Sequence, residues 1–151
     1  MVELRVDELT RLLSRVSLAL RYVWAAPATA VGIALAFPVC ACGALVRVRN
    51  GVIEVAGGLL ARFAQSSFGV SAITFGHVVL GVSHSVLARE RAHEYAHVRQ
   101  YEKWGVLFFP LYVASSLVQW ALGRNPYLDN AFEKQAIRVA AAPVNPIGQE
   151  S

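Results

Sequence analysis

Two histidines and a glutamate stand within five positions of one another in the segment RAHEYAHVRQYEKWG, residues 91–105. His93 and His97 are four residues apart, so on a helix both imidazoles project from one face and can bind a single ion. With Glu94 they form H-E-x-x-H, in which the histidines bind zinc and the glutamate takes a proton from the zinc-bound water. Zinc lowers the pKa of that water to about 7 and polarises the carbonyl under attack. The motif therefore predicts zinc-dependent hydrolysis, with Glu94 as the general base.

The alternative interpretation of the same residues is an exposed helix that carries ordinary surface charges. Two features of the surrounding sequence favour the metal site. The helix follows a segment that we expect to be a strand, and Gln100, Tyr101 and Trp104 extend the face that carries the histidines.

A catalytic zinc needs a third protein ligand and one open position. The candidates outside the motif are His77, His84, Glu102, Asp129 and Glu133. Glu102 is too close along the same helix and points away from the histidine face. We choose Glu133, in the segment NAFEKQA, because it lies on a later helix that could fold back against the first. The alternative for Glu133 is a capping box with Asn130, in which the carboxylate only satisfies a backbone N–H.

The remaining histidines have simpler interpretations than metal binding. His77 and His84 are expected to be a core or strand-end histidine rather than ligands. A donor for the developing oxyanion cannot be assigned from the sequence, and Tyr112 and Tyr127 are the possibilities.

The composition indicates membrane association. Of the 151 residues, 56% are hydrophobic and 16% are charged, which are respectively above and below the averages for soluble domains. The net charge of +4 comes from scattered basic residues that are not interleaved with stacking aromatics, which argues against a nucleic-acid partner. Attraction to anionic lipid explains the basic excess more simply. Cys40 and Cys42 suit neither a disulfide framework nor a metal clip, and we expect them to be small buried residues.

The N-terminal third predicts an amphipathic helix that runs into a membrane anchor. Leu9, Leu12, Leu13, Val16 and Leu20 recur at helical spacing. Residues 22–46 carry no charge and are long enough to cross a hydrocarbon core of about 30 Å. Pro27 and Pro38 predict a kink and leave a re-entrant hairpin as an alternative. Residues 105–123 are also apolar and predict either a membrane-embedded helix or a buried core helix.

The central part of the chain predicts a small α+β fold, with an antiparallel sheet packed on the helix that carries the motif. In VRVRNGVIEV, Asn50-Gly51 specifies a two-residue hairpin turn. The expected cross-strand pairs are Val46 with Val55, Arg47 with Glu54, and Val48 with Ile53. We further expect a short helix over 57–65, a third, buried strand in SAITFGHVVLG, a helix over 85–104, and a last helix opened by Asn130.

HEYAH followed by a glutamate one helix later resembles the gluzincin class of zinc metallopeptidases. The hairpin and strand ahead of the motif look like the minimal core of the M48-type membrane peptidases, although no aspartate follows Glu133 as it usually does there. The chain also resembles small bacterial membrane proteins in which HExxH is followed by VRQYEKWG and NPYLDN. The resemblance covers roughly residues 46–140. It implies zinc on His93, His97 and Glu133, Glu94 as general base, and residues 73–79 as a strand edge for an extended peptide.

We therefore expect three parts: an amphipathic and membrane-anchoring segment over 1–45, a zinc-metallopeptidase-like domain over 46–140, and a flexible tail over 141–151. The expected function is a membrane-associated zinc metallopeptidase of the bacterial inner membrane, with a peptide or protein substrate and membrane lipid as partners. The alternative is a small membrane scaffold or binding protein in which zinc is structural or absent.

Overall fold

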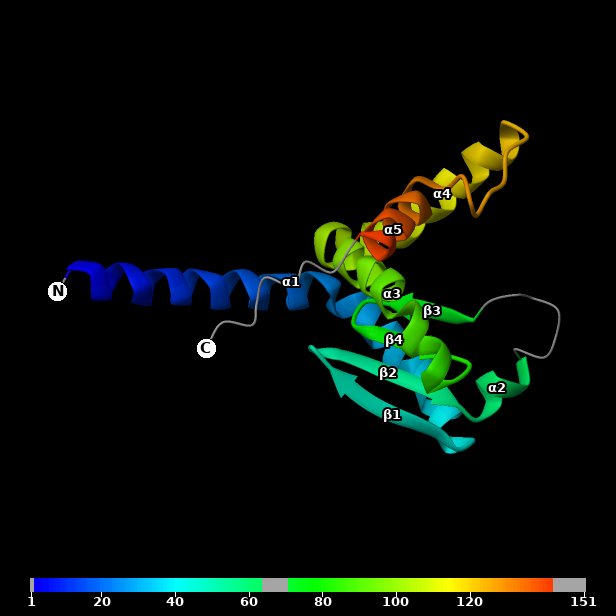
Figure 1. The fold of residues 1–151 in the computed structure, drawn as a ribbon, viewed down its shortest axis with the longest axis horizontal. Coiled ribbons are helices and arrows are strands. Elements are labelled where there is room, and N and C mark those ends of the chain that lie inside the picture. The colour runs from blue at the N-terminus through cyan, green and yellow to red at the C-terminus, as the bar shows by residue number, and fades with distance from the viewer. Residues whose placement is uncertain (1, 64–70, 143–151) are drawn as a thin grey trace.

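The α+β class is confirmed by the computed structural model, which describes residues 2–63 and 71–142 (Figure 1). The helices are α1 (Val2–Ala41), α2 (Leu59–Phe63), α3 (His84–Trp104), α4 (Phe108–Ala121) and α5 (Ala131–Ala141), with a 3-10 turn, η1 (Gly105–Leu107). The strands are β1 (Ala44–Arg49), β2 (Val52–Gly57), β3 (Ala72–Phe75) and β4 (Val78–Gly81). Nearly all of the tail expected over 141–151, and the end of the helix expected over 57–65, lie outside the described residues.

The hairpin is confirmed in the expected register. β1 and β2 pair antiparallel, and the three predicted cross-strand pairs are all formed. Asn50 and Gly51 both have positive φ, 50° and 78°, which is the geometry of a type I′ turn and explains why asparagine and glycine stand there.

The segment SAITFGHVVLG forms two strands where we expected one. β3 and β4 pair antiparallel around a turn at Gly76, whose φ of 58° lets the chain reverse within two residues. The sheet order is β1-β2-β4-β3, and β4 lies parallel to β2. The sheet is therefore mixed rather than wholly antiparallel. Between β2 and β4 the chain passes through α2 and β3, and this crossover lets β4 run in the same direction as β2.

The sheet lies between two helices. On one face, Val55 and Leu80 pack against Ala36 and Val39 of α1. On the other face, residues of β2 and β4 pack against α3, in a cluster made of Val52, Ala56, Val79, Leu87 and Val98. Because side chains alternate along a strand, the two faces of β2 supply both layers of the core. The second half of α1 is therefore part of the core.

A buried ion pair fixes α3 on the sheet. Glu54 of β2 is 1% exposed, and Arg91 of α3 donates to both of its carboxylate oxygens at 2.8 and 3.2 Å. The Tyr95 hydroxyl donates to the same carboxylate at 3.1 Å. Burial alone would raise the pKa of Glu54, but the hydrogen bonds from Arg91 and Tyr95 hold that pKa below its ordinary value. Removing one partner would leave an uncompensated buried charge, so the pair sets where α3 lies.

α1 is continuous through both of its prolines, so the re-entrant hairpin is not formed. Figure 1 shows that α1 changes direction where it reaches the sheet, as expected for a helix with internal proline. Its inner face is made of small residues, and a Cβ at Gly32 would lie 2.7 Å from Val78 Cβ. Of the two cysteines, both free, Cys40 is partly buried, whereas Cys42 is exposed, contrary to expectation, because it lies just beyond the end of α1.

Two helical stretches, Glu8–Ala41 and His84–Ala121, are long and apolar enough to cross a membrane. The first is most of α1. The second joins α3, η1 and α4, and its charged residues all belong to α3. Residues 105–123 were expected to be membrane-embedded or a buried core helix, and α4 is mostly exposed, which excludes the core helix.

Replacing Gly32 with valine should destabilise the fold by about 1–3 kcal/mol, because the added side chain meets Val78 and the Phe75 carbonyl. Ala34→Val, on the exposed face of the same helix, is the matched control and should cost less than about 1 kcal/mol. Denaturant unfolding in detergent micelles measures both. Equal losses would mean that α1 does not pack closely on the sheet.

Candidate metal centre

The two histidines of the motif stand on α3 as the sequence predicts. Ser83 caps the start of the helix, and its hydroxyl accepts a hydrogen bond from the Val86 N–H at 3.2 Å. Gly105 caps the end, with a φ of 57° that favours glycine. Between these two ends the i and i+4 spacing brings the His93 and His97 rings to a centroid distance of 4.8 Å.

Glu133 reaches the site from the first turn of α5. The buried side chain of Asn130 accepts from the Phe132 N–H at 2.9 Å and so caps the helix. The Asn130 amide also donates to Ser116 of α4 and to the Tyr112 carbonyl, which attaches the start of α5 to α4. The capping-box alternative for Glu133 is wrong, since the Asn130 N–H donates to the Tyr127 carbonyl. The Glu133 carboxylate points instead at the two histidines.

The three predicted ligands converge on one point. Their donor atoms all lie within 4.8 Å of one another. His93 Nε2 is 3.2 Å from Glu133 Oε2, and His97 Nε2 is 3.4 Å from Glu133 Oε1. The two Nε2 atoms are 3.1 Å apart. The third predicted ligand, Glu133, therefore comes from the later helix that the sequence indicates.

These atoms fit a divalent transition metal. Two imidazole nitrogens and one carboxylate oxygen form a donor set that zinc takes at catalytic sites, with a fourth position open. Glu133 Oε2 is buried and accepts no hydrogen bond from the described residues, although His93 Nε2 is near. Burial alone would raise the pKa of Glu133, but its contacts with the two imidazoles and Tyr112 hold that pKa well below the ordinary value. The carboxylate is therefore ionised, as a ligand must be.

Gln100 determines which nitrogen of His97 faces the centre. His97 Nδ1 is 2.8 Å from Gln100 Oε1, and since an amide oxygen can only accept, Nδ1 carries the proton. Nε2 is then the nitrogen that faces Glu133: it donates to the carboxylate when the ring is protonated, and it offers its lone pair to a metal when the ring is neutral. The Gln100 amide nitrogen donates to the Phe132 carbonyl at 3.0 Å and to Gln135 Oε1 at 2.9 Å, both on α5. One buried amide thus orients His97 and joins the two helices that carry the predicted ligands.

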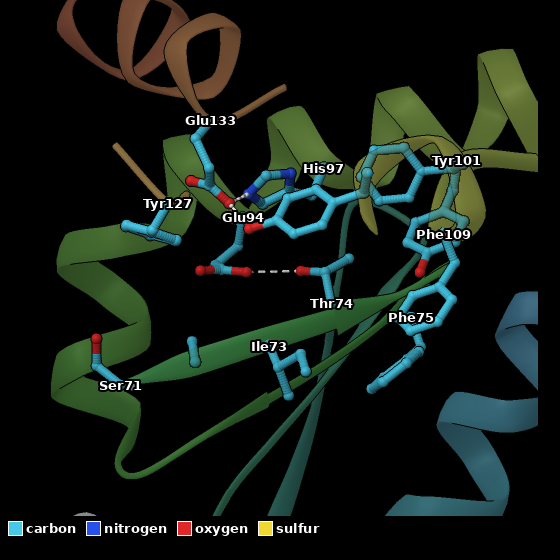
Figure 2. Close-up of a pocket in the computed structure, with 13 residues that line it drawn as sticks. Ser71, Ile73, Thr74, Phe75, Glu94, His97, Tyr101, Phe109, Tyr127 and Glu133 are labelled. Atoms are coloured by element: carbon cyan, nitrogen blue, oxygen red, sulfur yellow. Dashed lines mark hydrogen bonds and ion pairs between the residues drawn. The ribbon is translucent and has the colours of Figure 1, made fainter. Parts of the chain in front are cut away.

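Glu94 lies beside the cluster without belonging to it. It is 6% exposed, and the Thr74 hydroxyl of β3 donates to Glu94 Oε2 at 2.6 Å. Figure 2 shows Glu94 between Glu133 and β3, with its carboxylate turned toward the strand. A carboxylate that lies close to the predicted ligands and outside their donor set could act on a water molecule there.

A cavity of about 500 Å³ opens in front of these residues. Its polar end is formed by Glu94, His97 and Glu133, and one wall is β3 with Ser71 just before it (Figure 2). Aromatic side chains line the rest: Phe75, Tyr101, Phe108, Phe109, Tyr112 and Tyr127. The site is therefore a small polar centre at the end of an apolar pocket, which is the usual composition of a ligand site.

The two tyrosines named as possible oxyanion donors differ in their contacts. The Tyr112 hydroxyl donates to Glu133 Oε1 at 2.6 Å, so its proton is committed to a predicted ligand. Tyr127 lines the pocket and is 52% exposed. Burial of the hydroxyl, with the nearby charge of Glu133, raises the pKa of Tyr127 to about 12, so that it remains a hydrogen-bond donor at neutral pH.

The other ligand candidates lie elsewhere. His77, in the turn between β3 and β4, lies between two helices: its Nε2 is 3.2 Å from Glu102 Oε1 of α3, and the ring of Tyr22 of α1 stacks on it at 4.0 Å. Glu102 faces away from the cluster, as expected. Asp129 pairs with Lys134 at 2.7 Å. Within the described residues, His93, His97 and Glu133 are the one group that could hold a metal.

Comparison of the chain with protein-family models, curated proteins and solved structures finds no match. The candidate site therefore rests on the geometry of these residues.

Sequence reasoning missed the roles of two residues. Gln100 was placed on the histidine face, and its spacing of three from His97 was the signal that it could bond the ring. Thr74 gave no signal, because its contact with Glu94 depends on how β3 lies across α3.

Gln100→Ala should weaken zinc binding by about 10- to 100-fold, because it removes the group that orients His97. Isothermal titration with zinc measures the affinity. Gln135→Ala is the control, since within the described residues Gln135 bonds Gln100 and not His97, and the loss of affinity should be much smaller. Equal affinities for wild type and Gln100→Ala would show that the amide does not orient the ring.

Proposed function

We propose that the chain is a membrane-associated zinc metallopeptidase. The observation that carries this proposal is the convergence of His93, His97 and Glu133 next to a fourth residue, Glu94, that stays outside the donor set. The same donors could hold another divalent transition metal, and zinc is proposed because HExxH with a distant glutamate resembles the gluzincin pattern.

The division of labour follows from where the side chains lie. His93, His97 and Glu133 would hold zinc, which when bound lowers the pKa of a water ligand and polarises a substrate carbonyl. Glu94 accepts the proton of the attacking water and passes it to the leaving amine. Thr74 holds one oxygen of Glu94 at 2.6 Å, which leaves the other oxygen to receive that proton. Tyr112 holds Glu133, and Gln100 holds His97.

An extended peptide is the substrate that suits the pocket. β3 is an edge strand in the order β1-β2-β4-β3, and the pocket is lined by its residues up to Phe75. A strand edge offers backbone N–H and C=O groups to a peptide laid beside it. The resemblance implies a peptide-binding strand edge over residues 73–79. In the described sheet only the β3 part of this range is a free edge, because β4 is paired on both sides. A peptide on β3 would pass close to Glu94.

We propose that α1 holds the chain at the membrane, and that this membrane is the bacterial inner membrane implied by the resemblance. Residues 22–46 carry no charge, and the outer face of α1 is apolar and exposed, as at Val23 and Phe37. Such an apolar face is stable in contact with lipid.

The purified protein should bind one zinc per chain, and His93→Ala should abolish this binding. His84→Ala is the matched control, because His84 is also on α3 but does not belong to the cluster. Metal analysis after dialysis measures the ratio. Zinc retained by His93→Ala, or lost equally from His84→Ala, would contradict the proposed site.

Glu94→Gln should lower peptide hydrolysis by at least about 100-fold while zinc stays bound, because the amide cannot accept the proton. Glu90→Gln makes the same change one turn earlier on α3, outside the pocket, and should keep full activity. Cleavage of a quenched fluorescent peptide library measures the rate. Zinc bound with no cleavage by the wild type would favour a structural zinc, and full activity of Glu94→Gln would refute the mechanism.

A further inference from the structure

α4 has its polar residues turned toward the protein. Phe108 is buried, and the four partly buried residues of the helix are Tyr112, Ser115, Ser116 and Gln119, which recur at helical spacing on one face. The three polar residues among them are hydrogen bonded within the chain. Ser116 accepts from Asn130, Ser115 accepts from the Ala131 N–H, and Gln119 accepts from Arg124.

The rest of the α4 surface is apolar and exposed. Phe109, Pro110, Leu111, Val113, Ala114, Leu117, Val118, Trp120 and Ala121 make up this surface, which we call the outer face of α4. Leu117 is 57% exposed and Trp120 is 70% exposed. No polar residue interrupts the outer face, and residues 105–123 carry no charge.

This polarity is the reverse of that of a surface helix in water. A helix on a soluble domain turns its apolar stripe to the core and its polar residues to solvent. α4 does the opposite. An apolar environment around the helix explains this reversed arrangement. Polar side chains must then form their hydrogen bonds inside the protein, while apolar side chains face outward.

Two further features indicate that this apolar environment consists of lipid acyl chains. First, the start of α4 lies against the uncharged part of α1, since Phe108 packs in one cluster with Ala25, and a Cβ at Gly105 of the preceding η1 turn would lie 2.7 Å from the Trp24 ring. Second, Trp120 stands near the end of the helix, just before Arg124, and tryptophan followed by arginine is typical of a membrane interface. With 14 residues, α4 is about 21 Å long, which is shorter than a hydrocarbon core of about 30 Å.

We propose that the outer face of α4 is immersed in one leaflet of the bilayer, as a second membrane contact beside α1. Phe109 lies on this face and also lines the pocket, so the apolar end of the pocket opens at the acyl chains. The immersion of α4 is independent of the proposed peptidase activity, because it follows from the polarity of α4 and not from the metal cluster.

Site-specific fluorescence tests the proposal on the full chain. Cys40→Ala and Cys42→Ala remove the native cysteines, and a single cysteine is then introduced and labelled with an environment-sensitive nitrobenzoxadiazole group. Leu117→Cys reports on the outer face, and Arg138→Cys, on the exposed side of α5, is the matched control. The proteins are reconstituted in vesicles of phosphatidylglycerol and phosphatidylethanolamine, with or without bromine on the acyl chains.

Brominated lipid should quench the label at position 117 by at least about twofold and leave the label at 138 nearly unchanged, because bromine lies only in the hydrocarbon region. Equal quenching at the two positions would overturn the proposal. A label at 117 that is shielded from aqueous iodide yet insensitive to bromine would show that a protein surface, such as a second copy, covers α4, and would also overturn it. Val113→Cys repeats the measurement if Leu117→Cys does not fold.

Discussion

The structure depends on keeping one buried carboxylate ionised. Glu133 is 2% exposed, and an ionised carboxylate without partners is unstable in such surroundings. His93, His97 and Tyr112 supply the partners, and they come from two other helices. α3, α4 and α5 must therefore meet at this point for the charge to be tolerated. A site that gathers two imidazoles around a carboxylate is also a site that a divalent cation would stabilise further.

The rest of the fold holds α3 in the orientation that this meeting requires. The Glu54–Arg91 pair attaches α3 to β2, and the small inner face of α1 lets that helix approach the other side of the sheet closely. The same sheet places Thr74 of its edge strand against Glu94. Each contact is modest by itself, but together they define one register between helix and strand. The proposed general base and the proposed peptide-binding edge depend on that register.

Local patterns predicted much of this arrangement, whereas several contacts between distant segments were missed. Asn50-Gly51 specified its hairpin because the turn conformation is encoded in two neighbouring residues. Glu133 could be predicted as the third ligand because few carboxylates lie on a later helix that is able to fold back against the helix of the motif. The parallel pairing of β2 with β4 could not be predicted, since one apolar run gave no sign that Gly76 would reverse the chain. The reversed polarity of α4 became visible only when its hydrogen bonds to residues 124–131 were known.

X-ray absorption spectroscopy of the zinc-loaded protein tests the central claim most directly, because it reports the atoms bound to the metal. The account predicts two imidazole nitrogens at about 2.0–2.1 Å, carboxylate oxygen at a similar distance, and no sulfur. Loss of one nitrogen ligand in His97→Ala would assign the signal to this cluster. A zinc ion bound by sulfur at about 2.3 Å, or by oxygen alone, would contradict the account.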